Sequence, residues 1–237
     1  MPNSISRRAF VRAGALTSGA ALSSLSLPRF AGVSIARGQA YAASRPTADE
    51  ARKWLEEGNK RYVNCDASGP NRGPRRREEL AHKQEPFATI VSCVDSRVPP
   101  EIVFDRGIGD LFVIRTAGQV MDRAAIGSVE YGVAVLRTPL ILVLGHEDCG
   151  AVKAAIKVYD GGDPPDGDIA FLTNAIKPAV PPKSVPEPER LRKATDNNVA
   201  LTMRRLKESK IISGARDLKI LGAYCSLASA EVRFIAE

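Results

Sequence analysis

Two thiols and one imidazole have a spacing in this sequence that suits a metal site. Cys93 ends a run of apolar and β-branched residues, and His146 and Cys149 form a His-x-x-Cys motif after another such run. Thiolate and imidazole ligands favour zinc over magnesium or calcium. Three protein ligands with an open fourth position are typical of a catalytic zinc site, whereas a structural site would need a fourth ligand.

The residues around these three ligands strengthen the interpretation. A lone buried cysteine is usually a small hydrophobic residue, so neither motif alone is specific. Here Asp95 and Arg97 follow Cys93 and place a carboxylate and a guanidinium beside the first thiol. Gly145 and Gly150 flank the second motif and allow the backbone to approach a metal closely. The combined pattern predicts a reactive metal centre.

Alternating strand and helix patterns predict the elements that position these residues. We expect strands at 87–93, 110–116, 140–144 and 218–224, an edge strand at 232–235, and helices at 47–64, 78–84, 122–137, 150–159 and 197–209. The alternation predicts an α/β fold, with a mainly parallel sheet of four to five strands flanked by helices and an N-terminal helical arm. The carboxyl ends of parallel strands share one edge, so the three ligands are expected to converge there. The proline-rich segment 160–189 is expected to be a surface excursion.

The first 42 residues have the pattern of an export signal. Residues 6–11 (SRRAFV) resemble the twin-arginine motif, and Ala40-Tyr41-Ala42 gives a small-x-small cleavage pattern. The uncharged stretch 13–27 is too short to cross a bilayer. We therefore expect a signal peptide at 1–42, cleavage after Ala42, and one exported, periplasmic domain at 43–237 with no stable membrane span. The alternative is an anchor helix that stays attached.

The charge of the chain lies largely in this leader. The formal net charge is +7, but residues 1–42 contain five arginines and no acidic residue, which leaves 29 basic and 27 acidic residues in the rest. No stripe of lysine and arginine interleaved with aromatic residues remains there, so the pattern excludes a nucleic-acid surface. With 44% hydrophobic and 26% charged residues, the composition is that of a globular protein.

Four stretches together resemble the β-class carbonic anhydrases. They are CVDSRVPPEIVFD, GDLFVIRTAG, SVEYGV and VLGHEDCGAV, in that order, and WLEEGNKRYV and LGAYCSLASAEVRFI extend the resemblance over residues 47–236. The resemblance implies that Cys93, His146 and Cys149 hold one zinc ion per chain. It also implies reversible hydration of carbon dioxide to bicarbonate and a proton, with Asp95 and Arg97 as the catalytic pair.

The resemblance further implies how this pair works. Zinc lowers the pKa of water to about 7, so hydroxide is available to attack carbon dioxide at neutral pH. Asp95, when ionised, can only accept a hydrogen bond, here from that hydroxide. Arg97 would hold Asp95 ionised and turned away from the metal. Without this clamp Asp95 is expected to take the fourth position and close the site, as some members of the family do.

A substrate pocket and an assembly are also implied. Gln84 matches a glutamine that donates a hydrogen bond to bicarbonate, although the residue alone would be read as an exposed helix end. Phe112, Ala117 and Tyr131 match residues that line the pocket, partly from the neighbouring subunit, and Gly150 is expected to border it. The active unit is then a homodimer or a larger homo-oligomer. Asp105 and Arg115 are expected to be structural charges near the site.

The sequence departs from the family pattern at several positions. Thr116 and Gln119 stand where the family usually has asparagine, which changes the reach of the side chains. Ile90 stands where one branch of the family has a tryptophan in a regulatory bicarbonate site, so we expect that site to be absent. Cys65 and Cys225 could form a disulfide in an oxidising compartment, but we favour a loop thiol and a buried strand thiol.

Three other functions are compatible with parts of the pattern. The same zinc scaffold could hydrolyse carbonyl sulfide or carbon disulfide, which the ligand set does not distinguish from carbon dioxide hydration. A non-catalytic zinc-binding protein would not need Asp95 and Arg97, and both are present. A thiol redox protein would need a Cys-x-x-Cys motif or a paired resolving thiol near the nucleophile, and the sequence has no such motif.

Overall fold

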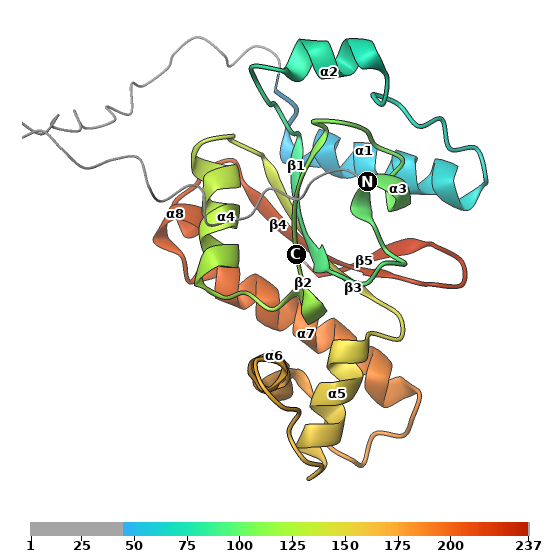
Figure 1. Cartoon of the computed structure of the whole chain (residues 1–237), viewed down its shortest axis with the longest axis vertical. Coiled ribbons are helices and arrows are strands. Elements are labelled where there is room, and N and C mark those ends of the chain that lie inside the picture. The colour runs from blue at the N-terminus through green and yellow to red at the C-terminus, as the bar shows by residue number, and fades with distance from the viewer. Residues whose placement is uncertain (1–44, 237) are drawn as a thin grey trace, which may run out of the picture. The chain divides into compact units, whose positions relative to one another are not determined.

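The computed structural model describes residues 45–236, so the predicted signal peptide lies outside the described residues (Figure 1). Five strands form one sheet in the order β2-β1-β3-β4-β5. The strands are β1 (Ala88–Cys93), β2 (Leu111–Thr116), β3 (Leu140–His146), β4 (Lys219–Cys225) and β5 (Val232–Ala236). All pairings are parallel except that of β4 with β5. The α/β fold class and the edge strand are therefore confirmed.

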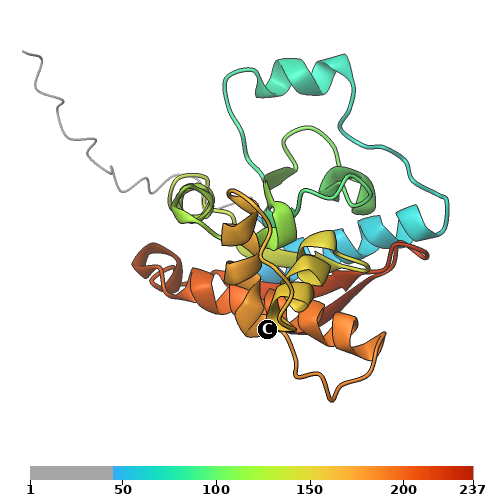
Figure 2. The same ribbon diagram turned by 60° about the horizontal axis from the view of Figure 1, so that its bottom comes forward.

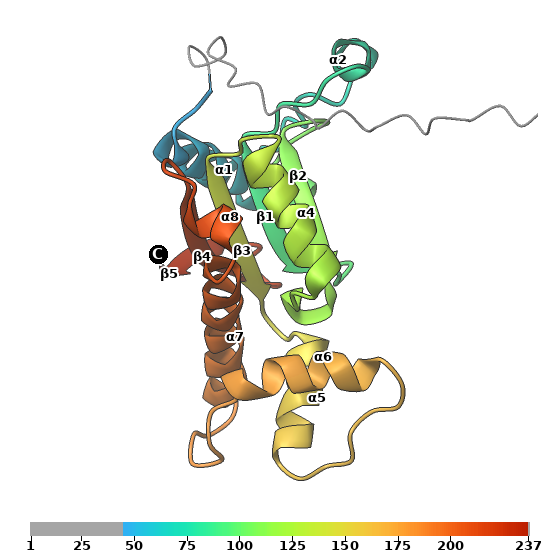
Figure 3. The same cartoon turned by 90° about the vertical axis from the view of Figure 1, so that its left-hand side faces the viewer.

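Helices cover both faces of the sheet. The helices are α1 (Ala48–Val63), α2 (Pro74–Leu80), α3 (Pro100–Val103), α4 (Arg123–Ala134), α5 (Gly150–Tyr159), α6 (Ile169–Ile176), α7 (Glu189–Lys207) and α8 (Lys210–Ser213), with 3₁₀ turns η1 (Ala117–Gln119) and η2 (Lys177–Ala179). One face of the sheet packs on α1 and α3, and the other on α4, α7 and α8 (Figure 3). Among the described residues, no helix has the length and apolar character needed to cross a bilayer.

The two central strands owe their position to uncharged, mainly apolar sequence. Every residue of β1 (ATIVSC) and of β3 (LILVLGH) is buried. Successive side chains of a strand point to opposite faces, so a strand between two helical layers has no position for a charged residue. In β3, Leu142 and Leu144 pack toward α1, whereas Ile141 and Val143 pack toward α4 and α7.

Helix α1 is fixed at its start by a capping box and along its length by two docking contacts. The Thr47 side chain accepts a hydrogen bond from the Glu50 backbone, and the Glu50 side chain accepts one from the Thr47 backbone. A Cβ at Gly58 would lie 1.8 Å from the Phe104 carbonyl oxygen, so only glycine permits this close approach. Asn59 donates to the carbonyl of Ala230 at 2.9 Å and accepts from the Val232 backbone N–H at 2.9 Å. The N-terminal helix is thereby joined to the C-terminal strand.

Helices α5 and α6 lie beyond the carboxyl ends of β1 and β3, at the bottom of Figure 1 and toward the viewer in Figure 2. With η2 and the start of α7 they form a cluster that includes Cys93, Cys149 and the fully buried Ile176. The expectation that 160–189 is only a surface excursion is therefore wrong. Ile176 and Val180 face this cluster although prolines and charged residues surround them in the sequence.

Two predicted helix boundaries are also wrong. Helix α7 begins at Glu189 rather than at residue 197, because the charged segment 189–196 is helical through ion pairs such as Arg192–Asp196 at 2.9 Å. Helix α2 spans Pro74–Leu80 rather than 78–84, and proline is favoured in the first turn of a helix. The short helices α3 and α8 were not predicted at all, since four residues are too few to show a helical period.

Candidate active site

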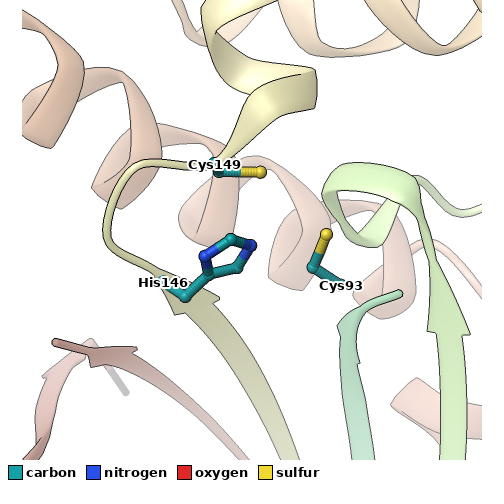
Figure 4. A group of neighbouring side chains, drawn as sticks. All are labelled: Cys93, His146 and Cys149. Carbon is teal, nitrogen blue, oxygen red and sulfur yellow. The ribbon is translucent and has the colours of Figure 1, made fainter. Parts of the chain in front are cut away.

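Cys93, His146 and Cys149 come together at the carboxyl edge of the sheet. Cys93 ends β1, His146 ends β3, and Cys149 precedes the first residue of α5. One ligand atom of each residue lies within 4.8 Å of the others, and all three residues are buried. Figure 4 shows the two sulfur atoms and the imidazole ring directed toward one another. The strand order explains this convergence, because β1 and β3 are neighbours in the sheet.

The imidazole is held in one tautomer. His146 Nδ1 donates a hydrogen bond to the Glu147 carbonyl oxygen at 2.8 Å. Nε2 then carries the lone pair, and it is buried without a hydrogen-bond partner among residues 45–236. A buried nitrogen acceptor with no donor is costly unless a ligand uses it. This nitrogen therefore points to a bound cation.

The pKa values of the two thiols are shifted in opposite directions. A hydrogen bond from the Cys149 thiol, chiefly, lowers the pKa of Cys93 to about 4 despite its burial, and the Gly118 backbone N–H contributes to the decrease. The same hydrogen bond and burial raise the pKa of Cys149. The pair thus shares one negative charge next to a free imidazole nitrogen. Two sulfur donors and one nitrogen donor fit a zinc ion and not a hard cation such as magnesium.

Arg97 binds the Asp95 carboxylate on both oxygens. Its Nε donates to Oδ1 at 2.9 Å and its Nη2 donates to Oδ2 at 2.7 Å, while the Arg97 backbone N–H donates to Oδ1 at 3.0 Å. These hydrogen bonds hold the pKa of Asp95 well below its usual range. Asp95 Oδ2 lies 4.0 Å from His146 Nε2. The carboxylate is therefore ionised and beside the metal ligands, but it is engaged by Arg97.

Arg115 fixes the backbone that carries these groups. Its Nε donates to the Cys93 carbonyl at 2.9 Å and its Nη2 donates to the Asp95 carbonyl at 2.6 Å. The prediction of a structural charge near the site is compatible with this contact. Asp105, by contrast, accepts from Arg61 in the last turn of α1 and from the Ser68 backbone in the loop that follows.

The predicted substrate residues fall into two groups. Ala117 begins η1, which touches the Cys93 sulfur, and Gly150 follows Cys149. A Cβ at Gly150 would meet no atom within 4 Å, so this glycine borders open space. Phe112 and Tyr131 lie together elsewhere, with ring centroids 6.2 Å apart, and Phe112 is paired with Thr89, near the opposite end of β1 from Cys93.

Gln84 belongs to the second group. It is exposed and precedes β1, whose opposite end carries Cys93. One chain therefore does not bring Gln84, Phe112 and Tyr131 to its own metal ligands. A pocket that used them would have to take them from a second copy of the chain.

Four hydrogen bonds at the site were not predicted from the sequence. The Gly118 backbone N–H donates to Cys93 Sγ at 3.3 Å, and the Asn198 side chain donates to the Gly118 carbonyl at 2.8 Å. The Glu147 carboxylate accepts from the Ser226 hydroxyl at 2.9 Å and from the Leu227 backbone at 2.7 Å. No local sequence pattern predicts such contacts, because the two partners of each are far apart in the chain.

The remaining cysteines lie outside the metal group. Cys65 is exposed after α1, and Cys225 is buried at the end of β4. Burial raises the pKa of Cys225 to about 11, so this thiol stays protonated at neutral pH. These positions are those of a loop thiol and a buried strand thiol.

The fold and the site together define a class: an α/β protein with a catalytic-type zinc centre of two cysteines and one histidine at the carboxyl edge of a parallel sheet. A family model described as "Carbonic anhydrase" matches residues 88–232, more than half of the chain. A carbonic anhydrase of Mycolicibacterium smegmatis is 47% identical over 137 residues, which cover 58% of this chain and 66% of that protein. The chain therefore belongs to the carbonic anhydrase family.

Solved structures show the same fold. The β-carbonic anhydrase CcaA has a TM-score of 0.62 at 24% identity and covers 78% of this chain and 99% of its own. One of two structures described as tetrameric β-carbonic anhydrases from Sordaria macrospora also has a TM-score of 0.62, at 22% identity, and covers 78% of this chain and 97% of its own. The likeness shows that the chain has the same fold as these β-carbonic anhydrases.

Proposed function

We propose that this protein catalyses the reversible hydration of carbon dioxide to bicarbonate and a proton, with one zinc ion held by Cys93, His146 and Cys149. The observation that carries the proposal is the buried group of two thiols and one unpaired imidazole nitrogen beside the Arg97-bound Asp95. Membership of the carbonic anhydrase family supports it.

Asp95, Arg97 and Gly150 have different roles in the proposed reaction. Zinc, when bound, lowers the pKa of water to about 7 and so supplies a nucleophile at neutral pH. Asp95 is ionised, so its carboxylate can only accept hydrogen bonds. By accepting one from the nucleophile, it turns a lone pair of the nucleophile's oxygen toward the carbon of the substrate. Arg97 keeps Asp95 in this position through its two hydrogen bonds. Gly150 leaves room for the apolar substrate next to Cys149.

The Asp95→Asn variant tests this assignment. The amide keeps the size of the side chain but presents an N–H where the nucleophile needs an acceptor, so hydration should fall by roughly 10²-fold. Stopped-flow hydration by the chain from Ala43 onward measures the rate, and zinc is quantified in the same samples. We expect about one zinc per chain in both proteins.

A matched exchange at the far edge of the sheet serves as the control. Asp49→Asn removes a carboxylate that is paired with Lys219 at 2.6 Å, and it should leave the rate unchanged. Equal rates for Asp95→Asn and the native chain would contradict the role of Asp95. Full zinc with hydrolysis of carbonyl sulfide or carbon disulfide but no hydration would favour those substrates, and full zinc with no activity would favour a zinc-binding protein.

We also propose that the active unit is a homodimer or larger, with each pocket shared between copies. Tyr131 is 47% exposed on α4, Phe112 lies on the edge strand β2, and α2 has no buried residue. These surfaces are available to a second chain, which could bring Gln84, Phe112 and Tyr131 to the metal ligands. Analytical ultracentrifugation would contradict the proposal if the fully active protein sediments as a monomer.

For localisation, we propose a signal peptide at 1–42 that directs one domain, 43–237, to the periplasm by a twin-arginine route. The support is the SRRAFV motif and the Ala40-Tyr41-Ala42 pattern. Replacing Arg7 and Arg8 by lysine should abolish export, because the twin-arginine motif is what the route reads. Fractionation followed by N-terminal sequencing tests this. Mature protein in the periplasm of the double variant, or a mature start other than Ala43, would count against it.

A further inference from the structure

The 3₁₀ turn η1 donates a backbone hydrogen bond to one of the metal-site sulfur atoms. The Gly118 N–H donates to Cys93 Sγ at 3.3 Å. An N–H donor withdraws electron density from a thiolate and fixes the direction of the sulfur lone pairs. The exact placement of this peptide therefore influences how Cys93 binds a metal.

Helix α7 holds this turn from one side. Asn198 is 2% exposed, and its Nδ2 donates to the Gly118 carbonyl at 2.8 Å. The contact joins residues that are 80 positions apart in the chain. Gly118 itself has left-handed dihedrals, φ 61° and ψ 25°, which leave its peptide orientation to be set by its partners.

Packing holds the turn from the other side. A Cβ at Gly118 would lie 2.6 Å from Ile176 Cδ1 and 3.0 Å from Ala151 Cβ, so there is no free space toward α6 and α5. The turn is thus confined between an apolar wall and two buried donors of α7, the Asn198 amide and the Thr202 hydroxyl, which donates to the Gln119 carbonyl at 3.4 Å. The Gly118 carbonyl and the Gly118 N–H belong to successive peptide groups that share the Gly118 Cα, so the bond from Asn198 restrains the residue whose N–H donates to Cys93.

We propose that Asn198 is a positioning residue for the metal centre, which sets the N–H···S hydrogen bond from Gly118 to Cys93 by anchoring the Gly118 carbonyl. The inference rests on the proposed role of Cys93 as a metal ligand. Asn198 touches neither substrate nor metal in this scheme and acts only through η1. Partners of this kind commonly change metal affinity by 10–100-fold when they are removed.

Cobalt(II) substitution provides a readout that does not depend on activity. Cobalt bound by thiolates has sulfur-to-metal charge-transfer absorption in the near-ultraviolet, whose energy falls as the sulfur becomes more electron-rich. Asn198→Leu keeps the approximate volume and removes the donor. We expect its charge-transfer band at longer wavelength than in the native protein, and a zinc affinity lower by about 10-fold or more in competition with a chelator.

The adjacent residue gives a matched control. Asn197 also lies on α7, and its amide donates to the Ala179 carbonyl at 3.0 Å, but this carbonyl belongs to η2 and not to the turn that donates to Cys93 Sγ. Asn197→Leu should leave both the cobalt band and the zinc affinity at native values. Asn198→Gln, which keeps a donating amide, should recover part of the native band energy.

The outcomes separate this inference from the proposed function. If Asn198→Leu folds and matches Asn197→Leu in band energy and zinc affinity, the positioning role is refuted while the zinc site stands. If the native protein binds cobalt without a charge-transfer band, the metal role of Cys93 fails first. If Asn198→Leu does not fold, Asn198→Ser replaces it, because the shorter serine side chain does not reach the Gly118 carbonyl well. A charge-transfer band at the native energy in that variant would equally refute the proposal.

Discussion

The Cys93→Ala variant is expected to lose zinc and to hydrate carbon dioxide at least about 10³-fold more slowly at neutral pH. Cys93 is the thiol that carries the negative charge of the group, because the Cys149 thiol and the Gly118 N–H both stabilise its thiolate. Two remaining ligands bind zinc weakly, and without zinc the pKa of water returns toward 15.7. Plasma emission spectrometry measures the zinc content, and stopped-flow spectroscopy measures the hydration rate.

Cys225→Ala is the matched control for this experiment. Cys225 is the strand partner of His146 in the register of β3 and β4, and it is as buried as the ligands. Its sulfur lies near the carbonyls of Ser226 and Ala230 instead of the metal group. The variant should keep about one zinc per chain. Equal loss of zinc in both variants would show that the loss reflects general damage to the core and not a missing ligand.

Asp105→Asn is expected to lower the free energy of unfolding by about 3 kcal/mol at pH 7. The Asp105 side chain is 0% exposed and accepts from Arg61 Nε at 2.7 Å, from the Ser68 backbone at 3.1 Å and from the Gly69 backbone at 2.8 Å. An amide cannot accept on both atoms, so one donor is left buried without a partner, and the guanidinium loses its counter-ion. Urea unfolding compares the two proteins.

The same carboxylate predicts how the difference depends on pH. Burial alone would raise the pKa of Asp105, but the hydrogen bonds from Arg61, Gly69 and Ser68 outweigh it and hold the pKa at about 2, below the usual 3.8. The folded pKa is lowered, so this stabilisation is complete above pH 4 and is lost as the pH falls toward 2. About 2 kcal/mol of the difference between native and variant should therefore disappear over that interval. A difference that stays constant down to pH 2.5 would contradict the assignment.

The site ligands were predictable because local sequence carries the necessary information. β1 and β3 are uncharged, mainly apolar runs up to their ligand residues, and a parallel sheet brings their carboxyl ends to one edge. Cys93 and His146 had to be close if the two strands were adjacent, as they are. Asp95 was predictable for the same reason, since it lies two residues beyond the strand. The Arg97 contact also depends only on neighbours in the chain.

The supports of the site were not predictable. Asn198 lies in a polar stretch of α7, where an asparagine normally indicates a solvated surface. Its burial depends on how α7 crosses η1, which is a tertiary property with no local signature. Helix α6 was missed because a short helix between two proline-rich loops shows too few turns for its period to be recognised. By resemblance, Phe112 and Tyr131 were expected at the pocket partly from the neighbouring subunit, and one chain does not bring them to its own metal ligands.

The bonds of Asn59 to Ala230 and Val232 join the first helix of the described domain to its last strand. A nascent chain emerges from the ribosome N-terminus first. Helix α1 is therefore made long before Ala230 and Val232, to which it is bonded in the folded domain. The hydrogen bonds of Glu147 to Ser226 and Leu227, which hold the His-x-x-Cys loop, also depend on residues that are made late. A nascent chain stalled before residue 226 would carry all three ligands without the contacts that hold them. The contacts that hold the His-x-x-Cys loop in place can therefore form only after residues 226 and 227 have been made.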